Sequence, residues 1–162
     1  MIVKPRIRGF ICTTAHPTGC AAHVQEQINY VAHQGMAADD AFKNVLVLGC
    51  SGGYGLASRV VAGLGYGANT LGVSFEKAPT ENKTASAGWY NNLAYERAAK
   101  EAGLYARTLD GDAFSDALRE QAAQVIRQDM GQIDLVIYLS LIHISEPTRQ
   151  EAISYAGVCV KK

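Results

Sequence analysis

The fold is decided by the stretch Asn44-Val-Leu-Val-Leu-Gly-Cys-Ser-Gly-Gly-Tyr-Gly55, in which a short apolar run leads into a cluster of glycines. The run 44–48 contains β-branched valines and is typical of a strand buried in a sheet. The glycines that follow it indicate a tight turn. A helix is expected after the turn, from about Gly55 to Leu64. This stretch therefore predicts a strand, a glycine-rich turn and a helix in direct succession.

The same alternation of strand and helix continues along the chain to residue 138. Apolar periodicity predicts further strands over 69–75, 105–109 and 133–138, and further helices over 87–102 and 115–129. Strict alternation predicts an α/β fold: a Rossmann-like parallel sheet of about four strands, with helices on both faces and right-handed crossovers. Ahead of this region we expect an extended segment over 2–14 and a helix over 19–33.

The composition argues against several classes of protein. The 162 residues include 15 basic and 15 acidic side chains, a balance that disfavours nucleic acid or an anionic membrane as the main partner. Hydrophobic residues make up 48% and charged residues 19%, which disfavours intrinsic disorder. We find no apolar run of membrane-spanning length and no secretory signal at the start. The four cysteines are too scattered for a disulfide framework, so a reduced, cytoplasmic protein is expected.

The glycine cluster has the spacing of a dinucleotide-binding loop. The pattern Gly49-x3-Gly53-x-Gly55 lies between a predicted strand and a predicted helix, as in short-chain-reductase-like folds. Glycine suits this position because the turn is tight and a pyrophosphate approaches the bare backbone at a helix N-terminus. Glu76 lies at the end of the next strand, 21 residues after Gly55. An acidic residue about 20 residues further on is expected to bind the ribose 2′-hydroxyl, so we interpret the segment as a dinucleotide site.

The same residues fit a second pattern, which belongs to a different class of enzyme. Gly49-x-Ser51-x-Gly53 matches the nucleophile elbow of serine hydrolases, with Ser51 as the nucleophile. That mechanism requires an acidic residue and then a histidine further along the chain, and the only later histidine is His143. Gly55 and Glu76 have no role in it, so the hydrolase remains the less supported alternative. A phosphate-binding P-loop is excluded because no Lys-Ser/Thr follows the glycines.

Two further groups of residues have side chains of a kind found in binding sites. Zinc would accept the donors Cys12, His16, Cys20 and His23, but the paired spacing that fixes a zinc site is missing, so we expect no metal. The aromatic pair Trp89-Tyr90 could line a substrate surface, although a place in the core or an interface is the preferred interpretation.

Five segments together resemble a known family. They are Lys4–Cys20, Val45–Arg59, Phe75–Lys77, Ala87–Tyr90 and Gly111–Ser115. They are similar, nearly collinearly from Met1 to about Tyr138, to the trans-2-enoyl-CoA reductase family, which includes the FabV-type enoyl-ACP reductases. The resemblance implies a cytoplasmic, monomeric enzyme of fatty acid synthesis that uses NADH to reduce the trans-2 double bond of an enoyl-CoA or enoyl-ACP thioester. In that family hydride goes to the β-carbon, and a tyrosine assisted by a lysine protonates the other side.

The resemblance also assigns cofactor contacts to this sequence. The implied contacts are Gly49, Cys50, Ser51, Gly52, Gly53 and Tyr54 for the pyrophosphate loop, Phe75 and Glu76 for the adenosine ribose, and Asp112 and Ala113 for the adenine. One departure is Gly52, where the family usually has a hydroxyl residue. Glycine there loses a possible phosphate hydrogen bond but keeps the backbone cradle.

The larger departure begins at residue 139. The family continues with Ser-Leu-Ala after Tyr138, whereas residues 153–162 of this chain resemble a translated sequencing adapter. We therefore expect an N-terminal extension over 1–43, an NADH-binding Rossmann-like region over 44–138 and a non-native tail over 139–162.

The catalytic pair of the family is also missing from the sequence. None of the eight tyrosines has a lysine four or nine positions later, and those are the spacings of the short-chain and FabV-type reductases. The expectation is an inactive, NADH-binding N-terminal portion of a reductase without catalytic residues of its own. A non-catalytic nucleotide-binding module is the alternative.

Overall fold

The structure is a computed structural model that describes residues 4–12, 14–36 and 42–139, with only the backbone of residues 11 and 12. Four parallel strands form the main sheet: β3 (Asn44–Leu48), β4 (Asn69–Ser74), β5 (Ala106–Asp110) and β6 (Leu135–Tyr138). The segment expected to be extended near the N-terminus contains an antiparallel pair, β1 (Ile7–Arg8) and β2 (Ile11–Cys12). The predicted α/β fold with a parallel sheet is confirmed. Apart from Leu139, the tail expected over 139–162 lies outside the described residues.

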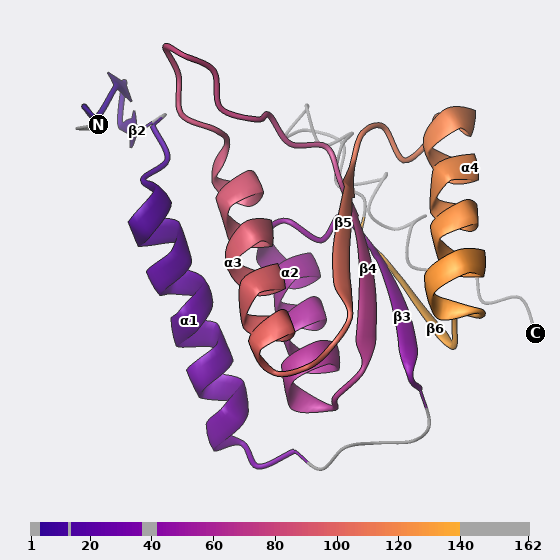
Figure 1. Cartoon of the computed structure of the whole chain (residues 1–162). Coiled ribbons are helices and arrows are strands. Elements are labelled where there is room, and N and C mark those ends of the chain that lie inside the picture. The colour runs from indigo at the N-terminus through magenta and orange to yellow at the C-terminus, as the bar shows by residue number, and fades with distance from the viewer. Residues whose placement is uncertain (1–3, 13, 37–41, 140–162) are drawn as a thin grey trace, which may run out of the picture.

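Helices cover both faces of the sheet, as expected (Figure 1). On one face α2 (Gly53–Val60) and α3 (Ala87–Glu101) lie next to the strands, and α1 (Pro17–His33) packs on the outer side of these helices. The other face carries α4 (Asp116–Val125). Two π-helical segments extend α2 and α4, namely η1 (Val61–Gly65) and η2 (Ile126–Met130). None of the described helices combines the length and the apolarity that crossing a membrane would require.

The starts of two helices explain small differences from the predicted ranges. Helix α1 begins at Pro17, two residues early, because Nδ1 of His16 accepts a hydrogen bond from the Gly19 N–H at 3.2 Å and caps the helix. Helix α4 begins one residue late because Ser115 is its N-cap, with Oγ accepting from the Leu118 N–H at 3.3 Å. In both cases a side chain satisfies an N–H group that the helix itself leaves without a partner.

Alternation along the central strand β3 builds a core on each side of the sheet. Val45 and Val47 pack with Ala62 and Ala68 on the side of α2 and η1. The leucines of β3, at 46 and 48, pack against the cluster on the side of α4. That cluster includes Leu71, Val73, Leu109, Leu118 and Val125. The period of two in a strand buried on both faces accounts for the apolar run that the sequence displays.

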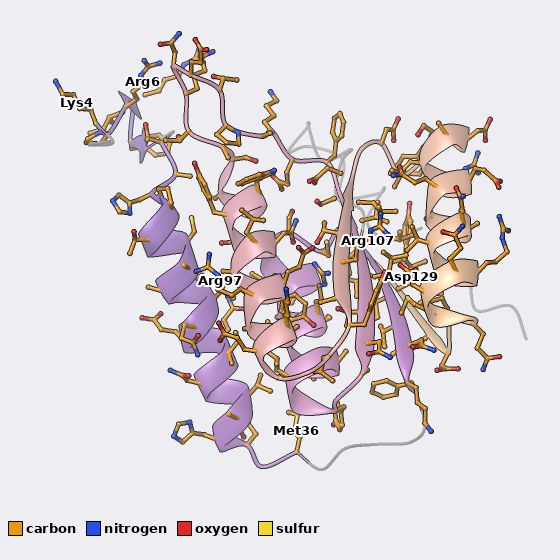
Figure 2. The ribbon with its side chains drawn as sticks, in the orientation of Figure 1. Lys4, Arg6, Met36, Arg97, Arg107 and Asp129 are labelled. Atoms are coloured by element: carbon orange, nitrogen blue, oxygen red, sulfur yellow. The ribbon has the colours of Figure 1, made fainter. Side chains whose placement is uncertain are left out.

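Polar contacts join the amino end of β5 to η2, which extends α4. Arg107 and Asp129 lie close together between β5 and η2 (Figure 2), with Nη1 of the arginine 3.3 Å from Oδ2 of the aspartate. The hydroxyl of Tyr105 donates to the same oxygen at 2.6 Å. These contacts hold the β5 edge of the sheet against the α4 layer.

The order of the strands creates a point where the chain changes direction. The order is β5-β4-β3-β6, so the chain leaves β3 toward β4 and β5 and later returns to the opposite side of β3 with β6. Leu48, at the carboxyl end of β3, is opposite Val73 of β4 and Tyr138 of β6. Ligands of open parallel sheets bind outside the carboxyl ends of the strands at such a switch point. The topology therefore predicts a ligand site at the carboxyl ends of β3 and β6.

Asp134 ties β6 to the start of β3. Its Oδ2 accepts from the backbone N–H groups of Lys43 at 2.8 Å and Asn44 at 2.9 Å. These two bonds lower the pKa of the Asp134 carboxyl below its usual value. Because the pKa is lower in the folded state, ionised Asp134 stabilises the fold above the unfolded-state pKa of about 3.9, and this stabilisation is lost as the pH falls through the folded-state pKa.

We expect Asp134→Asn to unfold at a lower urea concentration than the wild type at pH 7. The difference should shrink as the pH falls below about 4, because the wild-type carboxylate is then protonated as well. Urea titrations between pH 7 and pH 2 measure it, with Glu101→Gln, an exposed acid on α3, as the control. A difference that stays constant with pH would contradict this role for the carboxylate.

Candidate functional site

A pocket of about 680 Å³ opens at the carboxyl ends of the parallel strands. Its lining comes from the glycine loop (Leu48, Gly49 and residues 51–55), the end of β4 and the residues after it (73–76), Gly111, Ala113 and Leu139. Its volume lies within the range of small-molecule and cofactor sites. Eight of the ten residues assigned to the cofactor line this pocket: Gly49, Ser51, Gly52, Gly53, Tyr54, Phe75, Glu76 and Ala113. Cys50 and Asp112 are outside the lining.

The glycine loop requires glycine for two separate reasons. Gly49 and Gly53 have φ values of +84° and +51°, a region that side-chain-bearing residues rarely adopt. At Gly55 the reason is close approach, because a Cβ would lie 1.9 Å from the carbonyl oxygen of Gly49. The loop is also tied to β4, since the N–H groups of Gly49 and Cys50 donate to the Val73 carbonyl at 2.8 and 3.2 Å. The start of α2 therefore lies in close contact with the turn that precedes it, and the turn is fixed to β4.

The N-terminus of α2 faces this pocket. Its N-cap, Gly52, is extended (φ −163°) and makes no side-chain cap, and residues 52–55 are among the lining residues. The first N–H groups of an α-helix have no partner within the helix and carry the positive end of its dipole. This arrangement suits an anionic group such as a phosphate.

Glu76 is held by two serine hydroxyls at the rim of the same pocket. Oγ of Ser51, in the glycine loop, donates to Oε1 of Glu76 at 2.5 Å. Oγ of Ser86, just before α3, donates to Oε2 of Glu76. The Ser51 carbonyl in turn accepts from Nδ2 of Asn91 at 2.9 Å. The carboxylate therefore connects the glycine loop to the start of α3.

Sequence reasoning did not identify Ser86 or Asn91 as parts of this arrangement. The only signal for Ser86 was its place directly before a predicted helix, and that position indicates a cap. The same contacts weaken the hydrolase alternative. Ser51 donates to a carboxylate, and the described histidines belong to α1 or its cap at positions 16, 23 and 33.

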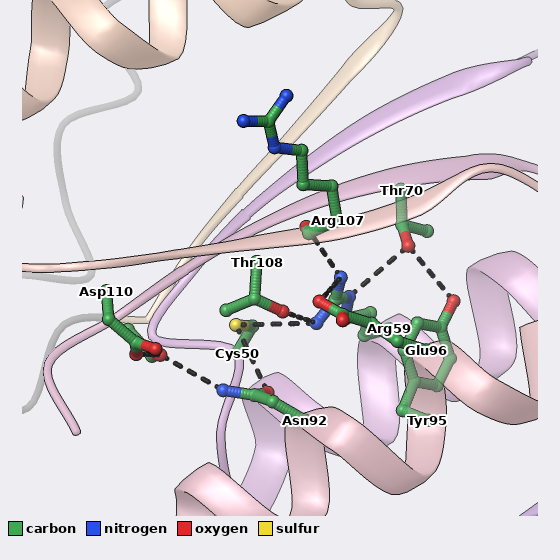
Figure 3. A network of polar contacts seen from close by, with 10 residues as sticks. Cys50, Arg59, Thr70, Asn92, Tyr95, Glu96, Arg107, Thr108 and Asp110 are labelled. Atoms are coloured by element: carbon green, nitrogen blue, oxygen red, sulfur yellow. Dashed lines mark hydrogen bonds and ion pairs between the residues drawn. The ribbon is translucent and has the colours of Figure 1, made fainter. Parts of the chain in front are cut away.

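The side chain of Cys50 is fully buried and belongs to a network of polar contacts (Figure 3). Its Sγ lies 3.6 Å from Oδ1 of Asn92, which also donates through Nδ2 to Oγ of Ser74 at 3.0 Å. The Ser74 hydroxyl donates to Oδ1 of Asp110 at 2.6 Å. Burial raises the pKa of the Cys50 thiol, so the thiol stays protonated, and the side chain of Cys50 does not reach a ligand in the pocket.

A fully buried arginine, Arg59 of α2, fastens the helix layer to the strands beneath the loop (Figure 3). Its guanidinium donates to two hydroxyls and a carbonyl: Thr70 at 3.2 Å, Thr108 at 2.8 Å and the Arg107 carbonyl at 2.8 Å. It also lies 4.0 Å from Glu96 and stacks 4.5 Å from the ring centroid of Tyr95. Buried charges persist where they are paired and hydrogen-bonded in this way. The network holds α2, α3, β4 and β5 in a fixed relation.

Asp112 and Ala113 follow the end of β5. Oδ1 of Asp112 accepts from the Phe114 N–H at 2.9 Å, and its carbonyl accepts from the hydroxyl of Ser115 at 2.8 Å. Asp112 thus shapes the turn before α4, while Ala113 reaches the pocket.

The remaining candidates are not among the residues that line the pocket. Trp89 and Tyr90 make an edge-to-face contact at 5.5 Å, and the Tyr90 hydroxyl accepts from the Ala85 N–H, so the pair packs around the start of α3. Within the described part of the chain, no three His, Cys, Asp or Glu residues gather as a metal site would require. The Cys12 side chain lies outside that part.

Family models match the chain in two adjoining parts. The NAD(P)H binding domain of trans-2-enoyl-CoA reductase matches residues 2–81. The trans-2-enoyl-CoA reductase catalytic region matches residues 83–156.

Individual proteins agree with the family models. An enoyl-[acyl-carrier-protein] reductase [NADH] of Pseudoalteromonas atlantica is 62% identical over 138 residues, which are 85% of this chain and 35% of that protein. FabV of Aeromonas salmonicida is 59% identical over 85% of this chain and 34% of its own length. The crystal structure of Treponema denticola trans-2-enoyl-CoA reductase in complex with NAD superposes with a TM-score of 0.78 and 51% identity, covering 86% of this chain and 36% of that one. The chain spans about a third of the length of the curated relatives it matches.

Proposed function

Because the chain belongs to the trans-2-enoyl-CoA reductase family, we propose that its pocket binds NADH as part of an enoyl thioester reductase. The observation that carries the proposal is that Glu76 shares one pocket with the glycine loop at the switch point of the sheet. Neither feature alone is specific, but a dinucleotide needs an anion cradle and a ribose acceptor within reach of each other.

Each part of the pocket is assigned a part of the cofactor. Residues 49–54 form the loop around the pyrophosphate. The N–H groups of Gly49 and Cys50 bind the Val73 carbonyl, so the pyrophosphate is held by N–H groups of residues 51–54, and the exposed Tyr54 flanks it. Phe75 and Glu76 contact the adenosine ribose, and Asp112 with Ala113 contacts the adenine. The fit of residues to cofactor rests on the close approach of Gly55 to Gly49, which leaves bare backbone where a diphosphate would lie.

The wider activity is part of the same proposal. The complete reductase reduces the trans-2 double bond of an enoyl-CoA or enoyl-ACP, with NADH supplying the hydride, and it acts as a cytoplasmic monomer. The residues of this chain bind and orient the cofactor. They do not supply the proton, because no tyrosine among them has a lysine at the family's spacing. We propose that the 162-residue chain alone binds NADH without turning over an enoyl thioester.

We also propose the boundaries 1–43, 44–138 and 139–162 for the extension, the cofactor region and the tail. The 138-residue alignments with curated relatives support the second boundary. The match of the catalytic-region model, which reaches residue 156, argues for some family character beyond it.

A binding experiment on the 162-residue chain tests the proposed function. NADH titrated into the wild type should show saturable fluorescence enhancement and tighter binding than NADPH. Glu76→Ala should narrow the ratio of the two Kd values by at least about tenfold, because the carboxylate accepts from the ribose hydroxyls of NADH and repels the 2′-phosphate of NADPH.

The matched control is Glu81→Ala, an exposed acid in the loop that follows Glu76. It should leave both Kd values unchanged. Absence of NADH binding by the folded wild type would refute the proposed function, and an unchanged ratio in Glu76→Ala would show that another group selects the cofactor.

A further inference from the structure

Ser86 is the second hydroxyl on the Glu76 carboxylate, and its position is unusual for a serine that begins a helix. It is the N-cap of α3, yet its side chain makes no cap bond. Ser115, at the same position of α4, does cap, since its Oγ accepts from the Leu118 N–H. A capping serine stabilises a helix because its hydroxyl accepts from an N–H group that the helix leaves without a partner. Helix α3 forgoes that bond while the Ser86 hydroxyl is turned onto Glu76.

The backbone fixes the direction in which the Ser86 hydroxyl donates. Oγ of Ser86 accepts from the Lys77 N–H at 3.0 Å, and the backbone N–H of Ser86 donates to the Lys77 carbonyl at 3.0 Å. A hydroxyl has one proton to give. With the oxygen already accepting from Lys77, the proton goes to Oε2 of Glu76, because the other acceptor, the Lys77 carbonyl, is farther from Oγ at 3.4 Å.

Ser51 and Ser86 together hold both oxygens of Glu76. A carboxylate accepts about four hydrogen bonds, so two serine donors leave about two acceptor positions, which matches the two hydroxyls of an adenosine ribose. A carboxylate held at both oxygens also cannot turn aside from a 2′-phosphate.

Gly88 keeps the space in which this arrangement sits. A Cβ at residue 88 would lie 2.1 Å from Oε1 of Glu76 and 2.7 Å from Cβ of Ser51. The carboxylate therefore rests against the first turn of α3, where the helix dipole favours a negative charge. The surroundings of the Glu76 carboxylate are thus built by three parts of the chain: the glycine loop, the segment after β4 and the start of α3.

From these contacts we propose that Ser86 is a positioning residue that sets the preference for NADH over NADPH by holding the Glu76 carboxylate toward the ribose. This inference rests on the proposed function. Ser86 acts through Glu76, so removing its hydroxyl matters only while the carboxylate is present.

The test compares Kd values for NADH and NADPH in Ser86→Ala, Ser86→Thr and the double variant Glu76→Ala/Ser86→Ala, with thermal unfolding of each. Ser86→Ala should lower the NADPH:NADH Kd ratio about fivefold, mainly through weaker NADH binding, because a hydrogen bond to a charged group is lost. Ser86→Thr, which keeps a hydroxyl, should stay within about twofold of the wild type. In the double variant the loss of Ser86 should not change the ratio beyond the effect of Glu76→Ala.

A destabilised variant far from the pocket separates positioning from stability. Val31→Ala opens the buried cluster between α1, α2 and α3, none of whose members lines the pocket, and it should lower the Tm without changing the ratio. An unchanged ratio in Ser86→Ala, an equal weakening of both cofactors, or a full further effect of Ser86→Ala in the absence of Glu76 would each overturn the proposal. Wild-type chain that binds no NADH would instead refute the function on which the proposal rests.

Discussion

Replacing Gly55 by alanine should weaken NADH binding at least about 100-fold, because the start of α2 can no longer lie against the glycine loop. The new Cβ would lie 1.9 Å from the Gly49 oxygen, 2.8 Å from the Gly49 carbonyl carbon and 3.3 Å from Cα of Cys50. All three are backbone atoms, so no side chain can move to relieve the contact. The helix must shift as a unit, and we also expect the free energy of unfolding to fall by about 1–3 kcal/mol.

NADH titration and chemical denaturation of the same samples measure the two effects. Gly52→Ala is the matched control for stability, since Gly52 is extended and a Cβ there would meet no atom within 4 Å. It should unfold at the wild-type denaturant concentration. Gly55→Ala protein with wild-type affinity for NADH would contradict the view that this close approach shapes the cofactor site.

Replacing Arg59 by methionine should lower the free energy of unfolding by about 3–5 kcal/mol. Methionine fills much of the same volume, but it leaves the Thr108 hydroxyl and the Arg107 carbonyl without the guanidinium donor, and the Thr70 hydroxyl keeps only its contact with the Tyr95 hydroxyl. It also leaves the Glu96 carboxylate without its cation. Unpaired polar groups in a buried site cost far more than the net value of the bonds themselves.

Urea denaturation at pH 7 measures the loss, with Arg97→Met as the control on the exposed side of α3. Arg97 stands beside Glu96 in sequence, and its replacement should change the stability by less than about 0.5 kcal/mol. Adding Glu96→Gln to Arg59→Met should recover part of the loss, because one unpaired charge is removed. A loss below about 1 kcal/mol in Arg59→Met would mean that the network does not hold the layers together.

Much of the fold followed from local sequence patterns. Strand β3 matches the predicted range 44–48 because an apolar β-branched run ends at glycines that need unusual backbone angles. Helix α3 ends at Glu101, one residue before the predicted end, and Gly103 follows with φ +75°. Strict alternation was sufficient to predict the parallel sheet with helices on both faces, which the structure confirms.

Other parts of the fold depended on contacts that no local pattern contains. The last residues of the predicted helices 55–64 and 115–129 belong to the π-helical segments η1 and η2 instead of an α-helix. Strand β6 begins at Leu135, two residues later than predicted, because Asp134 is used to bind the start of β3. Strand order was also not predictable, since the pairing of β6 with β3 is a long-range choice.

Part of the candidate site was likewise predictable from the sequence and part was not. The glycine loop and Glu76 were recognised from spacing, and the structure brings them to one pocket. The residues that hold them in place were missed, because a serine before a helix indicates a cap and an arginine within a helix indicates a solvated face. Ser86 and Arg59 take other roles only through neighbours that the tertiary fold supplies.

The order of the strands also has a consequence for the cost of assembling the sheet. Paired residues of β3 and β4 are 25 apart in sequence, those of β4 and β5 are 36 apart, and those of β3 and β6 are 90 apart. Closing the longest of these loops costs about 1 kcal/mol more chain entropy than closing the shortest. The β3–β4–β5 unit, which carries the glycine loop and Glu76, therefore gathers from near neighbours in the chain. Strand β6, on the other side of the switch point, pays the largest entropic cost for its pairing, and the two backbone bonds to Asp134 help to offset it.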